Sequence, residues 1–162
     1  MPVTSPIFKP MSIKPIIRPY RDSDKDRLIS ILRSNTPKYF ASEEEVHLSS
    51  FLENELQMYF VIEVQLQIVG SGGINFDKNN ILAVLSWDLI HPDFQNKSLG
   101  TLLVNYRLQL LKTHNTIERI SVRTSQHVYK FYEKQGFVLQ SIENDYWAIG
   151  FDLYEMSMSR AK

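Results

Sequence analysis

A short polar stretch directly before a leucine-rich segment is the part of this sequence best suited to binding an anion. It reads Gln-Asn-Lys-Ser-Leu-Gly-Thr over residues 95–101. Amides in the first turn of a helix lack intrahelical acceptors, and the helix dipole makes that end partly positive. Such amides bind phosphate groups. The same residues would equally serve as an ordinary helix start, so on their own they leave both interpretations open.

A single carboxylate, Asp88, lies within the strand predicted over residues 81–90. The two-residue period of a strand predicts one shared face for Val84, Ser86, Asp88 and Ile90. A buried, unpaired charge is costly, so this carboxylate needs a partner or a chemical purpose. Two roles stay open for Asp88: a general base acting through a water, and a structural aspartate bonded to neighbouring amides.

The elements that must position these residues follow the order β-α-α-β-β-β-α-β-α-β-β. A strand over 13–20 precedes two helices, whose starts resemble capping boxes at Ser23–Asp26 and Ser42–Glu45. Three segments rich in β-branched and aromatic residues then predict an antiparallel meander. We therefore expect one α/β domain with a mixed, mostly antiparallel sheet flanked by helices.

The helix after the polar stretch should bury one apolar stripe. Its spacing assigns to that stripe the residues Leu99, Leu102, Leu103, Tyr106 and Leu110.

Composition narrows the function classes. The 162 residues suit one domain, which we place over residues 12–162 behind a mobile leader at 1–11 with several prolines. A formal net charge of zero gives no sign of a nucleic-acid partner, and no apolar run is long enough for a membrane span or a secretory signal. We expect a cytoplasmic protein. The absence of cysteine removes thiolate chemistry, and no histidine pair has metal-ligand spacing, so we expect no metal.

Two motifs together resemble the GNAT superfamily of acyl-CoA-dependent N-acetyltransferases. The first is Gln-Asn-Lys-Ser-Leu-Gly at 95–100, which follows Ile-His-Pro at 90–92 and resembles the family pattern Q/R-x-x-G-x-G/A in all but one of its fixed positions. The second is Tyr-Glu-Lys-Gln-Gly-Phe at 132–137. The chain departs from the family where Ser98 replaces the first glycine and where Ser125 replaces an asparagine often found seven residues before the tyrosine.

The resemblance implies direct acetyl transfer from acetyl-CoA to a primary amine of a small molecule or protein. Coenzyme A would lie in a V-shaped gap between parallel strands at 86–90 and 118–122, with its pyrophosphate on the amides of residues 95–101. The cofactor-binding residues implied are Leu89, Ile90, Gln95, Asn96, Lys97, Ser98, Leu99, Gly100, Thr101, Ser125 and Gln126.

Tyr132 stands at the family's proton-donor position, and Asp88 is our candidate base. In this fold the acceptor enters opposite the cofactor, which implies walls formed by Tyr39, Phe40, Tyr146 and Trp147, although all four could equally be ordinary core aromatics. Family members often pair through their last strands, so a homodimer stays open. The alternative function is a non-catalytic acyl-CoA binding or sensing module that kept the phosphate loop.

Overall fold

All strands that the structure describes join one seven-stranded sheet in the order β1-β2-β3-β4-β5-β7-β6. The structure is a computed structural model that describes residues 14–161, so the predicted leader lies outside the described residues. The strands are β1 (Ile16–Pro19), β2 (Met58–Val64), β3 (Gln67–Phe76), β4 (Leu82–Ile90), β5 (Arg119–Thr124), β6 (Val138–Ala148) and β7 (Phe151–Ser159). The helices are α1 (Lys25–Ser34), α2 (Glu44–Asn54), α3 (Leu99–Leu111) and α4 (Tyr129–Lys134). The predicted fold class and element order are confirmed.

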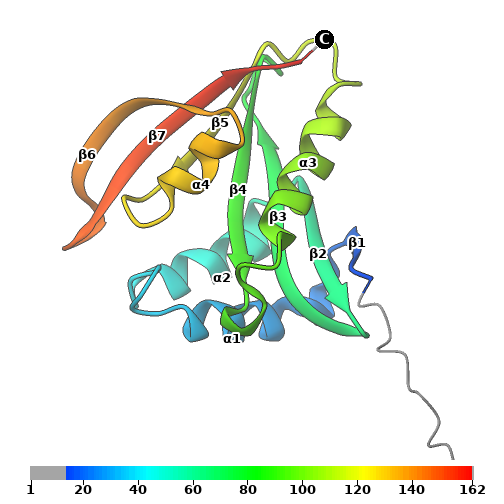
Figure 1. Cartoon of the computed structure of the whole chain (residues 1–162), viewed down its shortest axis with the longest axis vertical. Helices are drawn as coiled ribbons and strands as arrows, with labels where there is room; N and C mark the ends of the chain where they lie inside the picture. Colours follow the sequence, from blue (N-terminus) through cyan, green and yellow to red (C-terminus); the bar gives the residue numbers. More distant parts are fainter. Residues whose placement is uncertain (1–13, 162) are drawn as a thin grey trace, which may run out of the picture.

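The helices cover both faces of the sheet (Figure 1). Along β2, Tyr59 and Val61 pack with the residues of α1 and α2, whereas Phe60 and Ile62 pack with α3. This alternation is the two-residue period of a strand that is buried on both faces. The helices α1 and α2 therefore form one outer layer, and α3 lies on the opposite face of the sheet. No helix between residues 14 and 161 is both long and apolar enough to span a bilayer.

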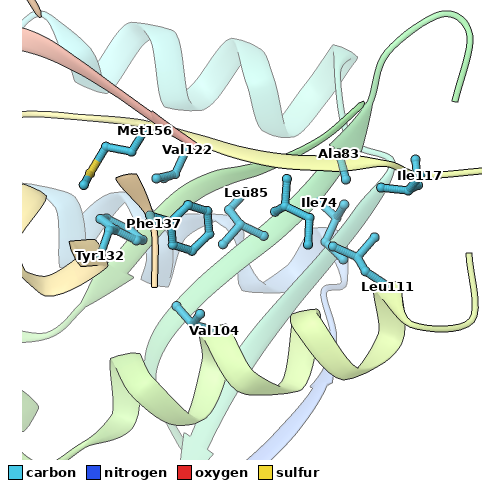
Figure 2. Close-up of a cluster of buried hydrophobic side chains, with 11 residues drawn as sticks. Ile74, Ala83, Leu85, Val104, Leu111, Ile117, Val122, Tyr132, Phe137 and Met156 are labelled. Atoms are coloured by element: carbon cyan, nitrogen blue, oxygen red, sulfur yellow. The ribbon is translucent and has the colours of Figure 1, made fainter. Parts of the chain in front are cut away.

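The largest apolar cluster joins α3 and α4 to the centre of the sheet (Figure 2). Val104 and Leu111 of α3 belong to this cluster together with Leu85 of β4 and Tyr132 of α4. Tyr132 is only 3% exposed. The ring that could carry chemistry is thus held by the packing of the core and cannot move freely.

The stripe predicted for α3 is partly wrong. Leu99 and Leu103 are buried as expected, but Leu102 is 38% exposed. The fully buried face is instead made by Leu99, Leu103, Val104, Arg107 and Leu111. Leucines occur all round this helix, so apolar spacing alone did not select the correct face, and an arginine occupies its centre.

The strand β4 carries a bulge that sequence patterning missed. Ser86 and Leu89 lie three residues apart in β4. Their partners in β3, Gly73 and Ser71, lie only two residues apart. Trp87 supplies the extra residue, with a left-handed φ of 49° that is rare for a bulky side chain. The hydroxyl of Tyr59 donates to the Trp87 carbonyl at 2.7 Å and helps to fix this conformation.

Because of the bulge, the single shared face predicted for β4 is wrong. That prediction grouped Val84, Ser86, Asp88 and Ile90. Leu85 packs in the α3 cluster, whereas Leu89, four residues later, packs with α1 and α2. The alternation is shifted by one residue, which turns Asp88 toward α3.

The gap expected between β4 and β5 is present. The two strands pair in parallel only from Leu82–Leu85 to Arg119–Val122, and β4 then runs on to Ile90 without a partner on that side (Figure 1). Residues 86–90 form one edge, as predicted. The other edge was placed too early, because residues 119–122 are paired and β5 leaves the ladder only at Arg123 and Thr124.

In both predicted capping boxes, the carboxylate that bonds back to the chain belongs to a residue one or two positions before the predicted one. The carboxylate of Asp24, rather than that of Asp26, accepts from the Arg21 amide at 2.8 Å. At the start of α2, Glu44 rather than Glu45 reaches back, and it accepts from the Ala41 amide at 2.7 Å. The acidic residue that turns inward is therefore Glu44.

Candidate active site

The loop before α3 presents a run of backbone amides with no acceptor. None of the amides of residues 96 to 101 donates to another group within residues 14–161. Asn96 and Ser98 both have left-handed φ values, of 59° and 62°. Successive amides in turns of this kind form concave anion sites, and the dipole of α3 adds to the effect. The local geometry is that of a phosphate-binding loop.

A cavity of about 560 Å³ opens at this loop. Among the residues predicted to bind the cofactor, seven line it: Ile90, Gln95, Asn96, Ser98, Leu99, Gly100 and Thr101. Gly100 lies against α4, where an added Cβ would be 3.1 Å from the Phe131 ring. Any larger side chain at position 100 would therefore displace Phe131 or fill the cavity.

Gln95 holds the loop against the end of β4. Its Nε2 donates to the Asn35 side chain at 2.8 Å and to the Ile90 carbonyl at 3.0 Å. Asn35, which is 3% exposed, donates to the same carbonyl at 3.0 Å. Sequence reasoning did not single out Asn35. Its position just after α1, two residues before Pro37, gave no sign that its side chain would bond a carbonyl 55 residues along the chain.

The remaining residues predicted for the cofactor lie elsewhere. Lys97 extends over the ring of Phe94, 5.2 Å from its centre. The side chain of Leu89 is buried among α1 and α2. Ser125 lines a second cavity, and Gln126 instead binds the turn between β6 and β7, donating to Gly150 and accepting from Asp152.

The Asp88 carboxylate accepts three hydrogen bonds from two side chains. Arg107 of α3 donates Nη1 to Oδ1 at 2.6 Å and Nη2 to Oδ2 at 2.8 Å, and the hydroxyl of Tyr132 donates to Oδ2 at 2.5 Å. The Arg107 side chain is fully buried, whereas that of Asp88 is 19% exposed. Gly72 makes room for this group, since an added Cβ would lie 2.5 Å from Oδ1. The partner that a carboxylate on β4 requires is thus Arg107.

Burial raises the pKa of Tyr132 well above its usual value, and the neighbouring Asp88 carboxylate raises it further. The positive charge of Arg107 opposes this shift without cancelling it. Tyr132 is therefore a neutral phenol at physiological pH, with its proton directed at Asp88 in the absence of a ligand.

A second cavity, of about 440 Å³, also borders Asp88 and Tyr132, and we call it the aromatic cavity. Three of the residues predicted as acceptor walls line it, namely Tyr39, Phe40 and Trp147. Tyr146 does not line it. Its ring is 42% exposed, and its hydroxyl accepts from Arg123 at 2.7 Å. The two cavities share a wall that includes Asp88 and Tyr132, and the other residues that line both are Tyr39, Phe40 and Val128.

The chain matches the family model described as an acetyltransferase (GNAT) domain over residues 30–160. The amino-acid acetyltransferase of Vibrio vulnificus is 34% identical over 86 residues, covering 53% of this chain but only 19% of that protein. The chain thus spans about a fifth of the length of the curated relatives it matches.

Solved structures share the fold. An aminoglycoside 6'-N-acetyltransferase complexed with coenzyme A has a TM-score of 0.73 at 17% identity and covers 91% of this chain and 98% of its own. The ribosomal-protein-S18-alanine N-acetyltransferase from Escherichia coli has a TM-score of 0.74 at 15% identity, over 92% of this chain and 96% of its own. With the extent of the family match, these findings confirm the resemblance read from residues 95–100 and 132–137, and the chain belongs to the GNAT acetyltransferase domain family.

Proposed function

We propose that this domain transfers an acetyl group from acetyl-CoA to a primary amine of a small molecule or protein, by direct attack within a ternary complex. One observation carries the proposal: the cavity at the phosphate-binding loop and the aromatic cavity share a wall that includes Asp88 and Tyr132. Two ligands, one in each cavity, would therefore bring their reacting ends to the same pair of side chains.

The residues present fit coenzyme A. The free amides of residues 96 to 101 suit a pyrophosphate, and the cradle left by Gly100 beneath Phe131 would be filled by any side chain. Beyond Leu85, the edge of β4 has no partner strand, so it can accept the amides of a pantetheine arm. When bound, acetyl-CoA supplies the thioester carbonyl that an amine can attack.

Tyr132 is proposed to deliver the proton that the leaving thiolate requires. Because burial and Asp88 raise the pKa of Tyr132, a free phenolate would be costly at this position. The hydroxyl is better suited to a relay, in which it gives its proton to sulfur as it receives the proton that the attacking nitrogen loses.

Asp88 is proposed to position Tyr132. Its two oxygens already accept three short hydrogen bonds from Arg107 and Tyr132, which leaves little capacity for a further proton. The alternative role from sequence, a general base acting through a water, predicts a different pH profile and can be tested separately.

The acceptor is proposed to be a cationic amine whose body packs among Tyr39, Phe40 and Trp147. Because the Vibrio vulnificus relative is an amino-acid acetyltransferase, free amino acids belong in the first substrate panel beside aliphatic and aromatic amines and peptides with a free N-terminus. The homodimer implied by the family resemblance also stays a prediction.

The test is release of free thiol from acetyl-CoA over this amine panel, with mass spectrometry of the acetylated product. We expect the wild type to acetylate at least one amine, and Tyr132→Phe to reduce kcat by about 10²-fold. Tyr129→Phe removes a hydroxyl from the same helix and serves as the matched control. If the protein binds coenzyme A but acetylates no amine, the non-catalytic acyl-CoA module is the correct reading.

A further inference from the structure

Glu44 is a buried carboxylate on the wall of the aromatic cavity. The residue is 6% exposed, at the first position of α2. Its Oε2 accepts from the Ala41 amide at 2.7 Å, whereas Oε1 has no hydrogen-bond donor within residues 14–161. Oε1 is nevertheless accessible to solvent. Within residues 14–161, the one side-chain nitrogen or oxygen atom that is both buried and without a hydrogen-bond partner is Nη2 of Arg27. One oxygen is therefore anchored, and the other keeps some solvent exposure on a residue that lines the aromatic cavity.

The setting of this carboxylate is unfavourable for its charge. The cavity wall around it includes the aromatic side chains of Phe40, Phe51 and Trp87, and no cation pairs with Glu44 among the described residues. Burial raises the pKa of Glu44, and the neighbouring Glu43 raises it further, while the Ala41 amide lowers it. A carboxylate held in this way gains from the arrival of an ammonium group or a proton.

We propose that Glu44 is the general base of the transfer: it binds the acceptor's ammonium group and removes its proton, directly or through one water. This inference rests on the proposed function. An amine protonated at neutral pH cannot attack, because its lone pair is occupied, so a base facing the cavity would speed the reaction. Glu44 and Tyr132 line the same cavity, and Glu44 keeps the free oxygen that Asp88 lacks.

The proposed steps balance. One ammonium proton moves to the Glu44 carboxylate, and the freed nitrogen lone pair forms the C–N bond to the thioester carbonyl carbon. The C–S bond then breaks, and its electron pair stays on sulfur. The second proton lost by nitrogen reaches sulfur through the Tyr132 hydroxyl, and Glu44 releases its proton to solvent. An N-acetylated amine, a free thiol and one proton result.

Other ionisable groups also face this cavity, so a pH effect must be assigned by comparison among variants. Those on its walls or beside Glu44 are Tyr39, Glu43, Glu55, Asp88, Arg123 and Tyr132.

The test replaces Glu44 by glutamine, which keeps the size of the side chain and an oxygen for the Ala41 amide. Glu43→Gln makes the same charge change at the same helix end, on an exposed residue, and is the matched control. With an amine that the wild type acetylates, kcat/KM of Glu44→Gln should fall about 10²-fold or more near neutral pH. The loss should shrink as the pH approaches the pKa of the amine, while coenzyme A affinity stays at the wild-type value.

Thermal unfolding gives a second readout, which needs neither amine nor coenzyme A. The pKa of Glu44 is raised above its usual value of 4.5, so the folded protein holds this proton more tightly than the unfolded chain. Wild-type stability therefore falls as the pH rises through the window above 4.5, and the cost is complete above the folded-state pKa. Glutamine does not titrate, so the Tm of Glu44→Gln relative to wild type should increase across this window.

A Glu44→Gln variant that is more stable near neutral pH but far less active supports Glu44 as the general base. A variant with unchanged activity, or with the same fractional loss at every pH, overturns it. A Tm lowered together with activity would show that Glu44 only caps α2. If the folded wild type acetylates no amine at all, the proposed function itself fails. If the wild type is active and Glu44→Gln is equally active, only the role of Glu44 fails.

Discussion

Arg107 and Asp88 form a bidentate ion pair, with Nη1–Oδ1 and Nη2–Oδ2 distances of 2.6 and 2.8 Å, across the space between α3 and the bulged end of β4. The guanidinium also donates to the Gly73 carbonyl at 2.9 Å, which fixes its orientation. This pair determines where Tyr132 places its hydroxyl, because the phenol donates to an oxygen already held by Arg107. The helix that carries the phosphate-binding loop thus also sets the geometry of the transfer centre.

Arg107→Met should be strongly destabilising. The substitution leaves Asp88 partly buried without its counter-charge, and removing one partner of a buried pair costs about 3–5 kcal/mol. Urea unfolding measures the change. Arg33→Met, which removes an exposed pair with Glu45, should have little effect and is the control. A loss in Arg107→Met no larger than in Arg33→Met would show that the pair does not hold this site together.

Asp88→Asn distinguishes a positioning residue from a base. If Asp88 orients Tyr132, the variant should lose a similar fraction of kcat at every pH, because the hydrogen bond to the phenol is weakened throughout. The measurement is a pH profile of kcat and kcat/KM, run in parallel with Glu44→Gln. Recovery of Asp88→Asn at high pH would return the role of base to Asp88.

Ser98→Gly should stabilise the protein. Ser98 has a left-handed φ of 62°, and a non-glycine residue in this region costs about 1–3 kcal/mol. Glycine removes that strain but has more freedom to lose on folding, by about 0.5–1 kcal/mol. These two effects differ by roughly 0–2.5 kcal/mol, and we expect a net gain of about 1 kcal/mol in urea unfolding. Destabilisation would mean that the serine hydroxyl contributes more than its backbone costs.

Much of the fold could be read from sequence because local signals agreed with one another. Strand composition, turn chemistry and the polar stretch at 95–101 all pointed to the same element order. The gap beside β4 followed from the family resemblance. What could not be read were features set by tertiary contacts. Trp87 has no local preference for a left-handed φ, so neither the bulge nor the turn of Asp88 toward α3 was predictable.

Two charged residues show why the site was incomplete from sequence. Arg107 occupies the centre of the buried face of α3, where an apolar pattern treats an arginine as a break. The signal that could have found it was the need of Asp88 for a partner. Glu44 was hidden because the capping box was assigned one residue late, and a shift of one position on a helix exchanges an exposed residue for a buried one.

Calorimetric titration with coenzyme A tests the central claim most directly, namely that the amides before α3 bind its pyrophosphate. The wild type should show saturable binding at one site. Gly100→Glu should lose it, because the new side chain meets Phe131 and brings a negative charge to the phosphate position. Leu102→Glu, an equal charge on a more exposed position of the same helix, should keep binding. No binding by a folded wild type, or equal affinity in Gly100→Glu, would contradict the account.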